Sequence, residues 1–233
     1  MVLAADGQAR PGAFCKGDYS YAGVQSAATR SGIRANLKVL RPASVHAGHV
    51  GGWVGVGGPG KGPGGTDQWL QAGYSAFPDG AAQLYYEVAL PRAAPQYHVV
   101  KAAVKIGESH LVSILGVGSR PGAWRVWVDN SPASPVYFLR GSHGRYEPQG
   151  IGETWSPNAS ACNTFAWRFG SVRVAMRPGG VWVKGKAAHE WNDRGYLVRF
   201  VPPDSFDTFS SDLGALTGNR EAKAVADRAG ARK

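Results

Sequence analysis

Two short segments, far apart in the chain, carry side chains that could do chemistry together. The first, Gln68-Trp-Leu-Gln-Ala-Gly73, offers the amide of Gln71. The second, Gln149-Gly-Ile-Gly-Glu153, offers the carboxyl group of Glu153. An uncharged amide with two N–H donors can stabilise an oxyanion, and a carboxyl group can exchange a proton during turnover. The two residue types therefore suit acid–base chemistry.

Both residues lie in segments that alternate as β-strands do. If Leu70 faces a core, Trp69 and Gln71 face the opposite side of the sheet. In the second segment, Ile151 and Glu153 share one face. A polar residue on such a face is most often only solvated, and this is the alternative to a chemical role.

Short alternating segments recur at about ten-residue spacing, with Gly, Pro, Asn or Asp between them. This rhythm predicts an all-β sandwich of antiparallel strands. The expected strands are 19–24, 33–40, 50–56, 69–75, 83–90, 97–106, 110–117, 124–128, 136–139, 164–175, 181–183 and 196–201. We expect an N-terminal segment at 1–18, a single sandwich domain at 19–203 and a basic C-terminal tail at 204–233, helical or disordered around 219–230.

The chain has 233 residues, a formal net charge of +10 and a pI near 9.8. Such a charge invites a nucleic-acid hypothesis. However, basic residues such as Arg34, Lys38 and Arg125 are scattered among apolar ones, and only 220–233 is visibly enriched. No RRM, KH or zinc-finger signature is present. We therefore expect a basic, solvated surface and no specific nucleic-acid partner.

The two cysteines, Cys15 and Cys162, are either buried thiols or a disulfide, and an exported chain favours the bridge. No stretch is long and apolar enough to span a membrane. Residues 1–14 lack the apolar core of a signal peptide.

The segment Gly55-Val-Gly-Gly-Pro-Gly60 satisfies the letters of a dinucleotide-binding GxGxxG motif. That motif needs a helix to begin inside it, with its N-terminus facing a pyrophosphate. The following residues, Lys61-Gly-Pro-Gly-Gly-Thr66, cannot start a helix. The segment is better interpreted as a flexible connection between strands.

The order of the segments resembles the eqolisins, which are glutamic peptidases. That family has strands of the types WVGI, LIQTG, WYE and WIxE. The corresponding segments here are Trp53-Val-Gly-Val-Gly57, Gln68–Gly73, Leu84-Tyr-Tyr-Glu87 and Gln149–Glu153. In addition, Ile106-Gly-Glu108 resembles the AGD turn of the family, and 165–174 resembles its closing strand. The resemblance covers about residues 33–175.

The resemblance implies a concanavalin A-like jelly-roll sandwich of two antiparallel sheets, with a substrate groove on its concave face that contains Gln71, Glu87 and Glu153. The Gly-rich segment would then be a mobile loop at the rim of this groove. It implies that Gln71 and Glu153 form the catalytic dyad, with Glu153 activating water and then protonating the leaving amine. It also implies an extracellular monomer that acts on polypeptides without a cofactor or metal. The residues expected to bind substrate are Trp53, Trp69, Glu87, Gln149 and Trp155.

Three features depart from the family pattern. Gly57 stands where an Asp usually follows the WVGI strand, and Gly150 replaces the Trp of the WIxE strand. Both changes are expected to fall near the dyad. The chain is also strongly basic, whereas typical eqolisins are acidic. These departures keep open a divergent relative or an interaction module that retains the fold without the activity.

A carbohydrate-binding or carbohydrate-cleaving sandwich is the alternative. Glu87 and Glu153 would supply paired carboxyl groups. Several aromatic residues, if exposed, would suit sugar stacking: Trp69, Tyr85, Tyr86, Trp124 and Trp155. A serine-hydrolase triad of His49, Ser75 and Asp79 lacks an elbow motif and is a weaker hypothesis.

Overall fold

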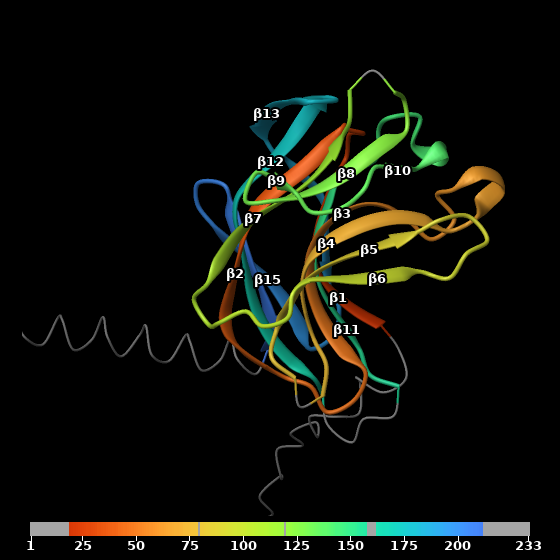
Figure 1. The fold of residues 1–233 in the computed structure, drawn as a ribbon. Coiled ribbons are helices and arrows are strands. Elements are labelled where there is room, and N and C mark those ends of the chain that lie inside the picture. The colour runs from red at the N-terminus through yellow and green to blue at the C-terminus, as the bar shows by residue number, and fades with distance from the viewer. Residues whose placement is uncertain (1–18, 79, 119, 158–161, 212–233) are drawn as a thin grey trace, which may run out of the picture.

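The structure is a computed structural model, and it describes residues 19–78, 80–118, 120–157 and 162–211. Figure 1 shows two layers of strands that pack against each other. All the strand pairings are antiparallel. The fold is therefore an all-β jelly-roll sandwich of two antiparallel sheets, as the sequence predicts.

The first sheet has seven strands. In spatial order they are β14 (Ala187–Asn192), β1 (Tyr19–Ser26), β11 (Gln149–Trp155), β3 (His49–Gly58), β4 (Gln68–Ala76), β5 (Gln83–Ala89) and β6 (Gln96–Lys101). The two segments with candidate chemistry, β4 and β11, are both neighbours of β3.

The second sheet has nine strands. Its main path is β10 (Tyr137–Phe138), β8 (Ala123–Val128), β7 (Ser109–Gly116), β2 (Gly32–Ser44), β12 (Thr164–Arg177), β16 (Ser205–Ser210) and β15 (Tyr196–Val201). In addition, β9 (Ser131–Pro132) pairs with β8, and β13 (Gly180–Lys184) pairs with β12.

The hydrophobic core lies between the sheets and takes every second side chain of each central strand. Leu70 and Tyr74 of β4 and Phe165 and Phe169 of β12 are all fully buried in it. Because side chains alternate along a strand, Gln71 projects from the other face of the seven-stranded sheet. The core thus fixes which residues can reach the outer face of this sheet.

The sandwich extends past residue 203, so the predicted start of the C-terminal tail at 204 is wrong. Pro202 and Pro203 form the turn between β15 and β16, and β16 inserts between β15 and β12. This strand is not predicted from the sequence because it contains the acidic residue Asp207, and a charged residue rarely occupies a central strand. Its carboxylate is completely buried and accepts hydrogen bonds from Arg168 and Arg199.

Strand β14 is a second element that the sequence analysis did not predict. The predicted helix at 219–230 lies outside the described residues, and so does Cys15. Cys162 is disulfide-bonded. Within the described part of the chain, no helix combines the length and apolar character needed to cross a membrane.

The Gly-rich connection between β3 and β4 contains one short 3-10 turn, η1 (Pro63–Gly65). The Gly60 N–H donates to the Asp67 carboxylate over 3.0 Å, and the Tyr146 hydroxyl donates to the Lys61 carbonyl over 2.9 Å. The loop therefore has defined hydrogen-bond partners, which the sequence analysis did not predict.

Candidate active site

Strand register brings the two candidate catalytic residues to one face of the seven-stranded sheet. Gln71 lies opposite Gly55 of β3 on one side and Glu87 of β5 on the other. Glu153 lies opposite Gly51, which is four residues before Gly55 on the same strand. All five positions therefore project from the face that points away from the nine-stranded sheet. Gln71, Glu87 and Glu153 thus share one face of this sheet.

The Glu153 carboxyl group is almost enclosed, with the residue only 8% exposed. Its Oε1 lies 3.2 Å from His49 Nε2, and its Oε2 accepts a hydrogen bond from Trp53 Nε1 over 3.2 Å. Both oxygens thus face nitrogen atoms on the adjacent strand. These contacts give the carboxyl group a fixed orientation, which a general base requires.

The Trp53 indole reaches Glu153 because two neighbours on its strand have no side chain. A Cβ atom on Gly55 would approach the indole to 2.7 Å, and a Cβ atom on Gly51 would approach it to 3.3 Å. The Gly-rich composition of β3 therefore leaves room for a large ring to lie along the sheet. This is the local reason why the WVGVG segment can position the carboxyl group.

The Gln71 amide donates a hydrogen bond to the Tyr85 hydroxyl over 3.1 Å. That hydroxyl lies 3.6 Å from the position of a Cβ atom on Gly51, the register partner of Glu153. Burial raises the pKa of Tyr85 well above its usual value, and the negative charges of Glu153 and Glu87 raise it further. Tyr85 therefore stays protonated, and its hydroxyl extends from the amide toward the strand beside the carboxylate.

Glu87 accepts a hydrogen bond from Trp69 Nε1 over 2.9 Å. Burial raises the pKa of the Glu87 carboxyl, the hydrogen bond from Trp69 opposes this shift, and the negative charge of Glu153 adds to it. The charge of Glu153 thus acts on Glu87 although two strands separate β5 from β11.

Aromatic rings border the Glu153 end of this face. The Trp155 ring lies 6.2 Å from that of Tyr19 and 5.8 Å from that of His49, between ring centroids. Tyr19 is half exposed, so a ligand on this face could contact its ring. At the other end, the Gln149 amide donates to the Gly57 carbonyl over 3.0 Å, which ties β11 to the start of the Gly-rich loop.

The two glycine departures have different settings, and Gly150 does not lie on the face of the dyad, contrary to expectation. Gly150 faces the core, where its added Cβ would lie 2.9 Å from the Phe206 ring. Phe206 stacks on Phe169 with centroids 4.5 Å apart, and this pair fills the space beside Gly150. Gly57 has φ +85°, and an added Cβ would lie 2.2 Å from the Gln68 carbonyl. Its backbone therefore excludes a side chain.

The expectation of exposed aromatic rings needs correction. Tyr85, Tyr86 and Trp124 are buried, at 4%, 6% and 0% exposure, so they are not sugar-stacking surfaces. In the alternative triad, Ser75 hydrogen-bonds to the Tyr97 hydroxyl and Asp79 lies outside the described residues. No signal in the sequence paired His49 with Glu153, because 104 residues separate them.

The described ranges contain no group of three or more His, Cys, Asp or Glu side chains that could hold a metal ion.

No protein-family model and no curated protein sequence matches this chain. Solved structures do. Scytalido-glutamic peptidase with a peptide-based transition state analog aligns at a TM-score of 0.53 and 14% identity, over 82% of this chain and 97% of that one. SCP-B, an eqolisin in complex with the tripeptide Ala-Ile-His, has the same identity and coverage at a TM-score of 0.49. Bacillus licheniformis beta-glucanase has a TM-score of 0.38 and 12% identity, over 80% and 67%.

At 14% identity, the likeness to the glutamic peptidase shows a shared fold. The class of protein defined here is thus a jelly-roll sandwich with the fold of glutamic peptidases and an enclosed carboxyl group on the outer face of one sheet.

Proposed function

We propose that this protein hydrolyses peptide bonds through Gln71, Glu153 and an activated water. The observation that carries the proposal is the setting of Glu153, which is 8% exposed and meets a nitrogen at each oxygen. A desolvated carboxyl group held in this way is poorly explained as a solvated surface residue. The eqolisin-like order of the surrounding segments supports the same assignment.

In the proposed reaction, Glu153 takes a proton from a water molecule whose oxygen attacks the peptide carbonyl carbon. The resulting oxyanion accepts a hydrogen bond from the Gln71 amide, which has a second N–H besides the one donated to Tyr85. Glu153 then gives its proton to the leaving amine as the carbon–nitrogen bond breaks. Trp53 and His49 keep the carboxyl group oriented through both steps.

The proposed substrate is an extended polypeptide in contact with Trp69, Glu87, Gln149 and Trp155, bound by a single protomer. We also propose that the protein acts outside the cell. The disulfide bond at Cys162 supports this location, because disulfides persist mainly in oxidising compartments.

The test is cleavage of a denatured protein substrate by purified protein between about pH 2 and pH 8, with pepstatin present to exclude aspartic peptidases. Glu153→Gln keeps the side-chain shape and should lower the rate by about 10²–10⁴-fold. Gln71→Ala should lower it by about 10²–10³-fold. Gln83→Ala, on the same sheet, is the matched control and should cleave like wild type. A wild-type protein without activity, or a Glu153→Gln variant with full activity, would remove the peptidase proposal.

A second candidate is cleavage or binding of a polysaccharide. Glu87 and Glu153 lie on the same face of the sheet, and glycosidases use a pair of carboxyl groups. The exposed ring of Tyr19 beside Trp155 would suit a sugar. Release of reducing sugar that Glu87→Gln and Glu153→Gln both abolish, without peptide cleavage by wild type, would establish this alternative.

A further inference from the structure

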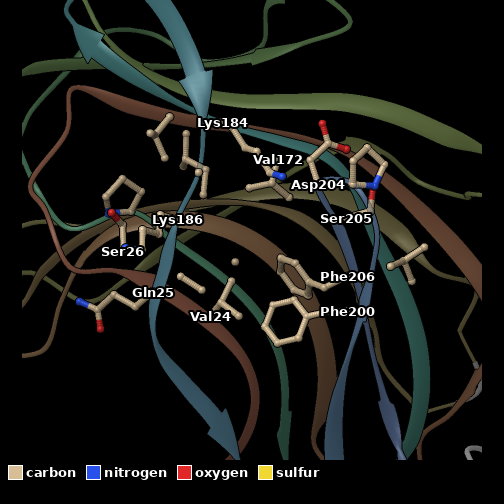
Figure 2. Close-up of a pocket in the computed structure, with 18 of the residues that line it drawn as sticks. Val24, Gln25, Ser26, Val172, Lys184, Lys186, Phe200, Asp204, Ser205 and Phe206 are labelled. Carbon is tan, nitrogen blue, oxygen red and sulfur yellow. The ribbon is translucent and has the colours of Figure 1, made fainter.

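A pocket of about 350 Å³ opens between the two sheets, on the inner side of the seven-stranded sheet. Figure 2 shows Val24, Phe200 and Phe206 around this space, with Lys184 and Lys186 beside it. Gly150 lines the pocket, whereas its neighbours Gln149 and Ile151 project from the opposite face of β11. The pocket is therefore separate from the candidate active site.

The inner wall of the pocket is apolar and contributed by both sheets. Val24 of β1 faces Val174 of β12 and Phe206 of β16, and each of these three residues is at most 9% exposed. At the rim, Phe200 is 53% exposed, so its ring is largely in contact with water. Covering exposed apolar surface of this kind with an apolar ligand lowers the free energy of the system.

The charge at the rim is positive. Lys184 and Lys186 are both exposed, and neither has an ion-pair partner among the described residues. The one carboxylate that lines the pocket, Asp204, forms an ion pair with Arg173. Its negative charge is thus compensated, and two ammonium groups remain to attract an anion.

We propose that this pocket binds a single-chain amphiphile with an anionic head group, of the class of a medium-chain fatty acid. Its hydrocarbon chain lies between Val24 and Phe206, and its carboxylate lies against Lys184 and Lys186. The volume falls at the small end of the range for small-molecule sites, about 300–1,000 Å³, which suits one chain rather than a two-chain lipid.

The experiment is titration calorimetry with decanoate below its micellar concentration. Gly185→Leu is the blocking variant, because a Cβ atom at Gly185 would lie 3.5 Å from Val172 and 3.7 Å from Val174, which are ordinary contact distances. It should weaken binding by about tenfold or more by filling the pocket. Ala188→Leu, an exposed position of the adjacent strand outside the lining, is the matched control and should bind like wild type.

The head group has its own test. The double variant Lys184→Gln/Lys186→Gln should weaken decanoate binding several-fold and remove most of its salt dependence. Methyl decanoate, which has no charge, should bind wild type no better than decanoate binds the double variant. Lys105→Gln, an exposed lysine elsewhere, should leave binding unchanged. Equal binding of decanoate and its methyl ester would overturn the head-group assignment.

Absence of decanoate binding to wild type, or binding that Gly185→Leu leaves unchanged, would overturn the pocket assignment. Cosedimentation of wild type with phosphatidylcholine–phosphatidylserine vesicles is the alternative outcome. If Gly185→Leu abolishes that cosedimentation, the ligand is a membrane lipid and the assignment of a free fatty acid is overturned. Circular dichroism and thermal unfolding of each variant show whether it is folded. Peptide cleavage should be the same in Gly185→Leu and wild type, so failure of this proposal is distinguishable from failure of the proposed hydrolase function.

Discussion

Among single residues, His49 makes contacts whose role in the proposed reaction can be tested. Its Nε2 lies 3.2 Å from Glu153, and its ring packs against those of Tyr19 and Trp155. The residue thus combines a polar contact with the candidate base and apolar contacts with the border of the face. A substitution that separates these two contributions tells whether His49 positions the carboxyl group.

We expect His49→Phe to lower kcat/KM for peptide cleavage by about tenfold. Phenylalanine keeps the ring contacts but removes the nitrogen atom that lies near Glu153, so the carboxyl group loses a polar contact that orients it. The measurement is kcat/KM for wild type, His49→Phe and His49→Gln, and Gln, which restores a polar group, should recover part of the rate. Equal rates for His49→Phe and wild type would mean that His49 only packs.

The environment of Glu87 predicts how the free energy of unfolding depends on pH. Its pKa is raised in the folded protein by burial, so the neutral form is favoured there. The stability that Glu87 contributes is therefore fully present below its ordinary pKa of 4.5 and is lost as pH rises through the raised value. Glu87→Gln keeps an acceptor for Trp69 and cannot ionise. The stability of wild type relative to the variant should then fall between about pH 3 and pH 7.

Urea unfolding of both proteins at the two pH values measures this difference. A difference that is constant with pH, or that grows in favour of wild type toward neutral pH, would contradict the raised pKa.

Among the strands, β16 shows how the core of this sandwich is completed. Phe206 enters the core from β16 and stacks on Phe169, and its ring reaches within 2.9 Å of a Cβ atom on Gly150. A strand that follows a pair of prolines thus supplies the side chain that lies against β11. The glycine at 150 and the phenylalanine at 206 fit each other across the sandwich.

We expect Phe206→Ala to lower the free energy of unfolding by about 3–5 kcal/mol, because it leaves a cavity in the core. Gly150→Ala should also destabilise, since its Cβ would overlap the Phe206 ring. Gly150→Ala should destabilise the Phe206→Ala variant less than it destabilises wild type, because the ring that it overlaps is absent. The two substitutions should therefore show a favourable coupling energy. Denaturant unfolding of the four proteins measures this cycle, with Phe200→Ala as a control at an exposed ring. Additive effects would show that the two positions do not share the space.

At the scale of the whole molecule, the predicted bridge from Cys15 to Cys162 would link the N-terminal segment to the sandwich just before β12. Cys162 is disulfide-bonded, and Cys15 is the other cysteine of the sequence. This bridge would close a loop of about 147 residues. On the chain-entropy model, closure of such a loop stabilises by about 4–5 kcal/mol.

We therefore expect reduction, or the double variant Cys15→Ser/Cys162→Ser, to lower the unfolding midpoint while leaving the β-sheet circular dichroism spectrum unchanged at low temperature. Thiol titration of denatured, unreduced protein should find no free thiol. Two titratable thiols would contradict the bridge.

The sequence by itself determined the local part of this structure. Alternation in segments such as 83–90 and 124–128 predicts strands, because side chains on a strand alternate between core and solvent. The same alternation places Gln71 opposite in direction to Leu70, and the structure has that arrangement. These properties depend on residues close together in the chain, so they can be predicted without knowing how the strands pair.

Only the tertiary structure decided what surrounds each of these residues. Strand order places β3 between β4 and β11, and this order brings His49 and Trp53 to Glu153 across about a hundred residues of sequence. Pairing between distant strands also buries Asp207 beside two arginines. The segment around Asp207 is therefore a strand, whereas the sequence analysis placed it in the C-terminal tail. Such contacts follow from the register of strands far apart in the chain, and a single sequence contains no local signal for that register.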